Sequence, residues 1–111
     1  MPVTDEMIEE VARRFALLSD PTRLRILHTL LEEGEQSVMG LARATGLARA
    51  NVSQHLSRLL GAGMVGRRRV GQSIHYSVVD ATLAPLCDLV CSAVQERTTQ
   101  LAAQLGHHRA G

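Results

Sequence analysis

The sequence predicts a mainly α-helical fold with one small β-hairpin. Apolar residues recur at helical spacing over most of the 111 residues, whereas this spacing ends in residues 64–79, where two possible strands flank "VGQS" and residues 74–78 alternate apolar and polar side chains. A short helix, a turn that contains a glycine and a second amphipathic helix come directly before this hairpin. Together these elements predict a winged helix-turn-helix domain with four helices, two strands and a long last helix.

The first two helices are predicted from their start signals. Thr4 can cap the first helix, whose opening turn is acidic and so suits the positive end of the helix dipole. The stretch "SDPTR" places Asp20 at the N-cap and Pro21 at the first position of a second helix, which ends at "EEGE", residues 32–35. The expected apolar stripes are Met7, Ile8, Val11, Phe15 and Leu18 on the first helix and Leu24, Leu27, Leu30 and Leu31 on the second.

Residues 37–62 are expected to form the helix-turn-helix. Ser37 can cap a short helix that Gly46 closes, because a left-handed residue is wanted there. After a turn of about three residues, a fourth helix runs from Arg49 to Ala62. Its inner face is expected to consist of Val52, Leu56, Leu59 and Leu60.

The wing and the last helix follow. Residues 64–79 form the wing, with strands over 65–70 and 74–79. The last helix begins near Thr82 or Leu83 and accepts Pro85 in its first turn, where the missing N–H has no intrahelical partner. Up to residue 105 it would be about 34 Å long, which exceeds what one small domain covers, so we expect a partner helix. Residues 106–111 are expected to be a flexible tail.

The charges are unevenly distributed along the chain. Its formal net charge is only +1, and it has no lysine. Residues 36–79 hold six arginines and no acidic residue, whereas residues 1–35 sum to −4 and residues 80–111 sum to −1. A basic segment without acids favours contact with phosphates, although a small domain can also segregate charge without function.

The polar side of the fourth helix and the wing predict where DNA is bound. Their side chains are of the types that hydrogen-bond base edges and phosphates, and a polar face that is merely solvated normally mixes acids with bases. The candidate DNA-binding residues are Arg49, Asn51, Ser53, Gln54, His55 and Arg58 on the helix, with Arg67, Arg68, Arg69, Gln72, Ser73 and His75 on the wing. A rival interpretation is a winged helix that binds a protein instead of DNA.

Composition argues against several other classes. One Phe, one Tyr and no Trp argue against a stacking platform for single-stranded nucleic acid. No apolar run approaches the length of a membrane span, and the acidic start lacks the features of a signal peptide, so we expect a cytoplasmic protein. Because no nucleophile and base combine in a plausible pocket, we expect no enzyme activity.

Two longer stretches carry a resemblance to a known family. "FALLSDPTRLRILHTLLEEGEQSV" and "LARATGLARANVSQHLSRLLGAGMVGRRRVGQSIHYSV" resemble the ArsR/SmtB family of bacterial winged-helix repressors over residues 7–80. The resemblance implies operator DNA as partner and a homodimer joined by residues 1–19 and 80–105. Ala48 and Gly61 depart from the family pattern and should loosen the ends of the fourth helix. The interface residues expected in the homodimer are Met7, Ile8, Val11, Phe15, Leu83, Leu86, Cys87, Val90, Val94 and Leu101.

The resemblance also implies a ligand that releases the DNA. The positions of the family's thiolate pair at the third helix fall on "QSVMG", which has no cysteine. At the positions of the family's second metal site, between the last helices of the two subunits, the chain has the carboxylates Asp80 and Glu96 but neither of the two histidines. The candidate metal ligands are Asp80, Glu96, His107 and His108, for nickel or alternatively zinc or cobalt. Such a reduced site would suit a regulator that needs a second protein as co-regulator.

Cys87 and Cys91 offer a different sensing chemistry. They stand four residues apart on the apolar side of the last helix and can be interface packing, a redox site or thiolate ligands. Within one helix this spacing disfavours a disulfide, because both Cβ vectors point the same way. The apolar neighbours of both thiols favour plain packing.

Overall fold

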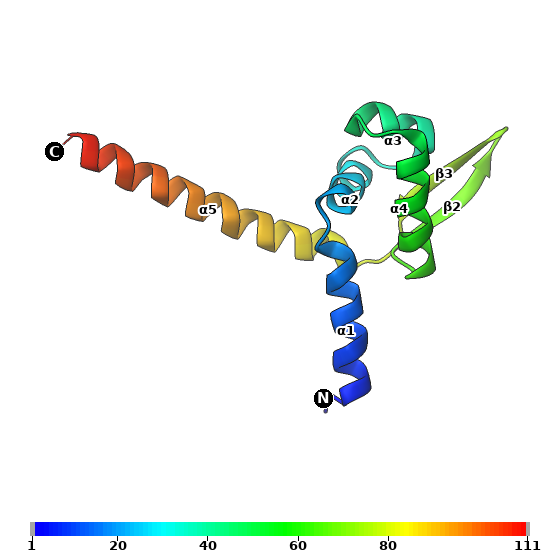
Figure 1. Cartoon of the computed structure of the whole chain (residues 1–111), viewed down its shortest axis with the longest axis horizontal. Helices are drawn as coiled ribbons and strands as arrows, with labels where there is room; N and C mark the ends of the chain where they lie inside the picture. Colours follow the sequence, from blue (N-terminus) through cyan, green and yellow to red (C-terminus); the bar gives the residue numbers. More distant parts are fainter. Residues whose placement is uncertain (1, 111) are drawn as a thin grey trace. The chain divides into compact units, whose positions relative to one another are not determined.

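The computed structural model describes residues 2–110, and the side chains of residues 2–106. The described chain contains five helices and three strands and divides into two compact units, with the boundary in the sequence after Asp80. In the first unit the order is α1 (Asp5–Leu18), α2 (Pro21–Glu33), β1 (Gln36–Ser37), α3 (Val38–Thr45), α4 (Arg49–Gly61), β2 (Val65–Val70) and β3 (Ser73–Val78). The second unit is α5 (Leu83–Ala110). Figure 1 shows α3 and α4 joined by a short turn, and β2 and β3 as an extended hairpin.

The predicted helix starts of α1, α2 and α3 are confirmed by hydrogen bonds. Thr4, Asp20 and Ser37 each accept a backbone N–H from the residue three positions later, at 3.1, 2.9 and 3.0 Å respectively. Gly46 ends α3 with φ of 75°, a left-handed conformation that suits glycine. Ala48 precedes α4 and makes no side-chain capping hydrogen bond, as its methyl group predicts. These local signals place the helix-turn-helix correctly.

The core of the first unit lies where α2, α3 and α4 meet the sheet. Its buried side chains are Ile26, Leu27, Leu30, Leu41, Val52, Leu56, Leu59, Met64 and Val65. The sequence prediction was wrong for Leu24, which is 40% exposed, and it omitted Ile26, which is fully buried. At about 100° per residue, Leu24 lies roughly 110° around the α2 axis from the centre of the stripe formed by Ile26, Leu27 and Leu30. Leu31 is half-buried at the margin of that stripe.

The sheet contains one strand more than the sequence predicts. β1 pairs antiparallel with β3, and β3 pairs antiparallel with β2, so the order is β1-β3-β2. β1 has only two residues, and Ser37 is at once its last residue and the N-cap of α3, so no alternating period could reveal it. In this register Ser37 and Arg68 both pair with His75, which places the three side chains on one face of the sheet.

Helix α5 begins at Leu83, where the sequence predicts it, and has Pro85 in its first turn. It is assigned up to Ala110, beyond the predicted end at residue 105, and the flexibility predicted for the tail stays a prediction. None of the described helices is both long and apolar enough to cross a membrane.

Candidate nucleic-acid interface

Helix α4 has one buried side and one exposed polar side. Val52, Leu56 and Leu59 are fully buried and fix the rotation of the helix about its axis. The exposed side holds hydrogen-bonding side chains and no carboxylate, as the sequence predicts. Its exposed members are Arg49, Asn51, Ser53, Gln54 and Arg58. Because the buried leucines and valine hold the helix in place, these groups all project from its outer side, where their donors and acceptors suit base edges and phosphates.

His55, also predicted to bind DNA, lies closer to the protein core than the other polar residues of α4. It is half-buried, and its Nδ1 lies 3.5 Å from Nη1 of Arg23 on α2. The backbone N–H of Arg23 lowers the pKa of Asp20, and the charges of Arg23 and His55 lower it further. His55 therefore belongs to the contact between α4 and the start of α2, and its DNA contact stays a prediction.

Arg23 has a structural role that the sequence does not reveal. Its Nε donates to the carbonyl oxygen of Leu17 at 2.7 Å, so the side chain satisfies a carbonyl in the last turn of α1. Asp20, in the same motif, caps the start of α2. The five residues "SDPTR" thus fix how α1 ends and how α2 begins. The motif predicted the second half of this arrangement only.

On the wing, formed by β2 and β3, one arginine is held in an ion pair. Nε and Nη2 of Arg68 donate to the two carboxylate oxygens of Glu35, each at 2.8 Å. His75 Nδ1 lies 3.8 Å from the same carboxylate. The hydrogen bond with Arg68 lowers the pKa of Glu35 and raises the pKa of Arg68. The remaining predicted wing contacts, Arg67, Arg69, Gln72 and Ser73, are exposed.

A shallow hollow of about 450 Å³ lies at the turn between α3 and α4. Its lining combines apolar groups with two guanidinium groups and consists of Met39, Ala42, Arg43, Leu47, Ala48 and Arg49. Arg43 is exposed and donates to the sulfur of Met39 at 3.5 Å. The sequence prediction counted Arg43 in the basic segment but did not include it in the binding face. Its place beside Arg49 extends that face from α4 to α3.

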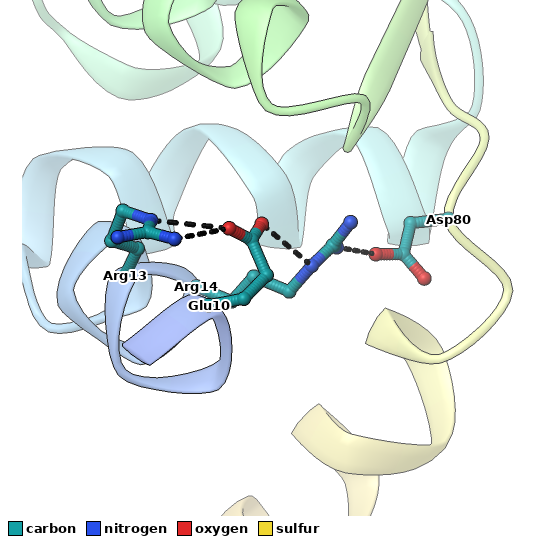
Figure 2. Close-up of polar contacts among 4 residues, drawn as sticks. All are labelled: Glu10, Arg13, Arg14 and Asp80. Atoms are coloured by element: carbon teal, nitrogen blue, oxygen red, sulfur yellow. Dashed lines mark hydrogen bonds and ion pairs between the residues drawn. The ribbon is translucent and has the colours of Figure 1, made fainter. Parts of the chain in front are cut away.

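The candidate metal ligands are not brought together in the described part of the chain. Nη1 of Arg14 lies 2.9 Å from the Asp80 carboxylate, and Glu10 approaches the same guanidinium at 3.9 Å (Figure 2). Glu96 is exposed on α5, in the other unit, and the side chains of His107 and His108 lie outside the described residues. Among the side chains that are described, no group of three or more His, Cys, Asp or Glu could hold a metal ion.

Both cysteines are free thiols on α5. Cys87 is half-buried, and Cys91 is exposed. Burial raises the pKa of the Cys87 thiol, and the neighbouring Cys91 and Asp88 raise it further. The Cys87 thiol is therefore kept protonated, which disfavours reaction as a nucleophile.

The residues expected in a dimer interface lie on α1 and α5, which we describe separately. None of the 14 residues of α1 is buried, and four of its large apolar residues are exposed: Met7, Ile8, Val11 and Phe15. On α5, Val90, Val94 and Leu101 are exposed, Leu86 and Cys87 are half-buried, and Leu83 is buried. Each helix thus exposes an apolar stripe to solvent.

The arrangement defines a class of protein. A helix-turn-helix with an acid-free outer face, followed by a basic β-hairpin, is a winged helix-turn-helix of the kind found in DNA-binding regulators. The model of the bacterial regulatory protein arsR family matches residues 20–66. The chain belongs to this family of transcriptional regulators.

Three similar proteins illustrate the relationship. The chain is 45% identical over 83 residues to the HTH-type transcriptional regulator CmtR of Mycobacterium bovis, a match that covers 74% of this chain and 70% of CmtR. It is 40% identical over 78 residues to a probable mercury resistance operon repressor of Streptomyces lividans, which covers 70% of this chain but only 62% of that repressor. A homodimeric winged helix-turn-helix DNA-binding domain from Mycobacterium bovis, solved by NMR, superposes with a TM-score of 0.76 at 32% identity, covering 87% of this chain and 92% of that domain.

Proposed function

We propose that the chain is a transcriptional repressor that binds double-stranded operator DNA through α4 and the wing. The observation that supports this most is the outer side of α4, which is exposed and free of carboxylates while its inner side is fully buried. An α-helix with such a face fits the major groove of B-DNA. Family membership agrees with this function.

The side chains divide into two kinds of contact. Asn51 and Gln54 suit adenine, and Arg49 or Arg58 suits guanine, so these residues would read sequence. Arg67 and Arg69 on the wing, with Arg43 on α3, would contact phosphates and position the protein without reading sequence. The exposure of all seven side chains supports this division.

Arg58→Ala tests the proposal, with Arg25→Ala as the matched control because Arg25 is an exposed arginine of α2 outside the proposed face. In a fluorescence-anisotropy titration of operator DNA, we expect Arg58→Ala to weaken binding by about 1–3 kcal/mol if the residue reads a base, or to reduce the salt slope by about one if it contacts a phosphate. Arg25→Ala should bind like the wild type. Unchanged affinity and slope in both Arg58→Ala and Arg67→Ala would favour the protein-binding winged helix instead.

We further propose that the repressor is a homodimer in which α1 and α5 of each copy form the interface. The exposed apolar stripes of both helices support it, since a side of this kind is normally covered. The similar domain from Mycobacterium bovis is homodimeric. Two copies would also present two α4 helices to two half-sites of DNA.

Sedimentation velocity of Val94→Asp tests the dimer. Val94 is a 60% exposed apolar residue of α5, and Gln95→Asp is the matched control on the polar neighbour. A charge within an apolar interface is costly because it loses its water without gaining a partner. We expect Val94→Asp to dissociate at concentrations where the wild type and Gln95→Asp sediment as dimers. A monomeric wild type would refute the interface.

For the effector we propose a metal ion that weakens DNA binding. The similarity to a mercury resistance operon repressor supports a metal in general. Asp80 and Glu96 with His107 and His108 supply mixed oxygen and nitrogen donors, which nickel accepts, as do zinc and cobalt. Because Asp80 is paired with Arg14, a metal at this carboxylate must displace the guanidinium.

Calorimetric titration of the wild type with Ni²⁺, Zn²⁺ and Co²⁺, followed by operator binding in the presence of each ion, tests this site. We expect the variant with His107→Ala and His108→Ala to lose both the uptake of the metal and its effect on DNA binding, while Asp88→Asn on the same helix keeps both. If the wild type takes up metal but binds operator DNA with unchanged affinity, the metal response would require a second protein as co-regulator. No uptake at all would exclude the site.

A second effector chemistry is favoured by the position of the two thiols. Cys87 and Cys91 are four residues apart, so they are neighbours on the surface of α5, and soft metals prefer thiolates. The similarity to the mercury resistance operon repressor fits such a metal as well. Cys87→Ser combined with Cys91→Ser should abolish the release of DNA by Hg²⁺ or by an oxidant. An unchanged response would confine both cysteines to packing.

A further inference from the structure

Glu35 is an acidic residue whose side chain lies against the basic wing. It is the last acidic residue before the acid-free segment 36–79. The sheet order β1-β3-β2 puts two strand widths between the start of β1 and β2, yet the Glu35 and Arg68 side chains together bridge them, and both carboxylate oxygens accept hydrogen bonds from Arg68 at 2.8 Å. The carboxylate also lies 3.8 Å from His75 on the strand between them. A negative charge is thus folded onto the basic wing.

The two partners of this ion pair differ in exposure. The Arg68 side chain is 67% exposed, whereas the Glu35 side chain is only 27% exposed. An incoming phosphate can therefore reach the guanidinium, and it meets the carboxylate directly behind it. The lowered pKa of Glu35 keeps that carboxylate ionised at neutral pH.

We propose that Glu35 is an internal competitor for DNA phosphate, which neutralises the charge of Arg68 and thereby weakens the binding of the wing to DNA. This inference rests on the proposed DNA-binding function. An arginine bound bidentately to a carboxylate adds no net charge to the wing, so Arg67 and Arg69 carry its attraction for phosphate. To contact Arg68, a phosphate must break the pair or accept the repulsion of Glu35.

The opposite role, in which Glu35 orients Arg68 for a phosphate, is weaker on physical grounds. An ion pair as exposed as this one restrains its arginine little. The repulsion between the carboxylate and the phosphates, by contrast, acts in every docked complex and extends over about 10 Å at 0.1 M salt. Charge competition therefore outweighs orientation.

Glu35 should consequently set affinity without changing sequence preference. Phosphate contacts are the same for every DNA sequence, and base contacts come from α4. A repressor that must dissociate from its operator benefits from such a limit on its non-specific affinity for DNA.

Glu35→Gln in the full chain tests the proposal, with Glu33→Gln as the matched control. Glu33 is exposed at the end of α2 and forms no ion pair with the side chains that the structure describes. In salt titrations of operator and of unrelated DNA, we expect Glu35→Gln to bind both DNAs about three- to tenfold more tightly at 0.1 M salt and to steepen the log–log slope by about 0.9, the value for one added phosphate contact. Glu33→Gln should match the wild type.

Two further variants keep the test decisive. Arg68→Gln should reduce the salt slope by less than Arg67→Gln, because Arg68 is already neutralised. In the Arg68→Gln background, Glu35→Gln should lose most of its effect on the slope. Thermal melting of each variant separates these effects from misfolding.

Two results would overturn the proposal. In one, Glu35→Gln binds no more tightly than the wild type while melting normally. In the other, Arg68→Gln reduces the slope as much as Arg67→Gln, which remains decisive even if Glu35→Gln does not fold. A failure of the proposed function is distinct from both, because the wild type itself would then show no salt-dependent DNA binding.

Discussion

Arg14 on α1 donates a hydrogen bond from Nη1 to Asp80, 66 residues later in the chain, over 2.9 Å (Figure 2). The Asp80 side chain is only 12% exposed, whereas that of Arg14 is 43% exposed. The contact ties the segment after β3 to α1. It also places a cation of the protein itself at the carboxylate that the sequence predicts as a metal ligand.

We expect the Arg14–Asp80 pair to stabilise the first unit modestly. Because the Arg14 side chain is 43% exposed, water partly screens the pair, and a double-mutant cycle of Arg14→Gln and Asp80→Asn should give a coupling of about 0.5–1 kcal/mol. Urea unfolding of the four proteins measures it. A coupling of zero would show that the pair contributes nothing to stability.

Ala48→Ser should stabilise the domain. Ala48 has the extended conformation of an N-cap, with φ of −65° and ψ of 144°, but has no oxygen to accept a backbone N–H of α4. A serine there would supply one, and we expect the free energy of unfolding to rise by about 0.5–1 kcal/mol. Thermal melting measures the change, and Ala50→Ser, inside the first turn, serves as control. Equal stability of wild type and Ala48→Ser would contradict the assigned cap.

Gly61→Ala should also stabilise α4. A Cβ at Gly61 would meet nothing within 4 Å, and its φ is not positive. Alanine therefore gains helix propensity without a clash, by about 0.5–1 kcal/mol. Gly63, with φ of 73°, is the contrasting control, because alanine there is strained and should destabilise. If Gly61→Ala and Gly63→Ala shifted the melting temperature in the same direction, the result would be inconsistent with these backbone conformations.

The cap at Asp20 should make stability depend on pH. The Arg23 backbone N–H lowers the pKa of Asp20 below its ordinary value of 3.8. A group whose pKa is lowered in the folded state stabilises the fold above its unfolded pKa, and this contribution is lost as pH falls through the folded pKa. We therefore expect urea unfolding at pH 6 to give a larger free energy of unfolding for the wild type than for Asp20→Ala, and this difference should shrink below pH about 4. A margin independent of pH would mean that the charge is not involved.

Cys87 should react slowly with alkylating reagents. Burial, Cys91 and Asp88 raise its pKa, which reduces the thiolate fraction at neutral pH. Because burial, the largest of these causes, is kept in Cys91→Ser, we expect the remaining Cys87 to react with iodoacetamide several-fold more slowly than a free cysteine in solution at pH 7.5. Mass spectrometry follows the modification. A rate equal to that of free cysteine would remove the main argument against a reactive thiol.

Prediction from sequence worked best where the signals are local. The caps at Thr4, Asp20 and Ser37 were predicted correctly, because a cap binds a backbone N–H three residues away. The exposure of Leu24 was not predicted, because which part of an apolar stripe is buried depends on the elements packed against it. The strand β1 was missed for the same reason, since two residues become a strand only by pairing with β3.

The sequence by itself determined the helix starts, the wing and the six arginines between residues 36 and 79, since these follow from short-range periodicity, capping and composition. Only the tertiary structure decided which of those charges stay available. It placed Glu35 against Arg68 and Arg14 against Asp80, over separations of 33 and 66 residues. Ion pairs form between groups that the fold brings within about 4 Å, and proximity of that kind leaves no trace in the local pattern of a sequence.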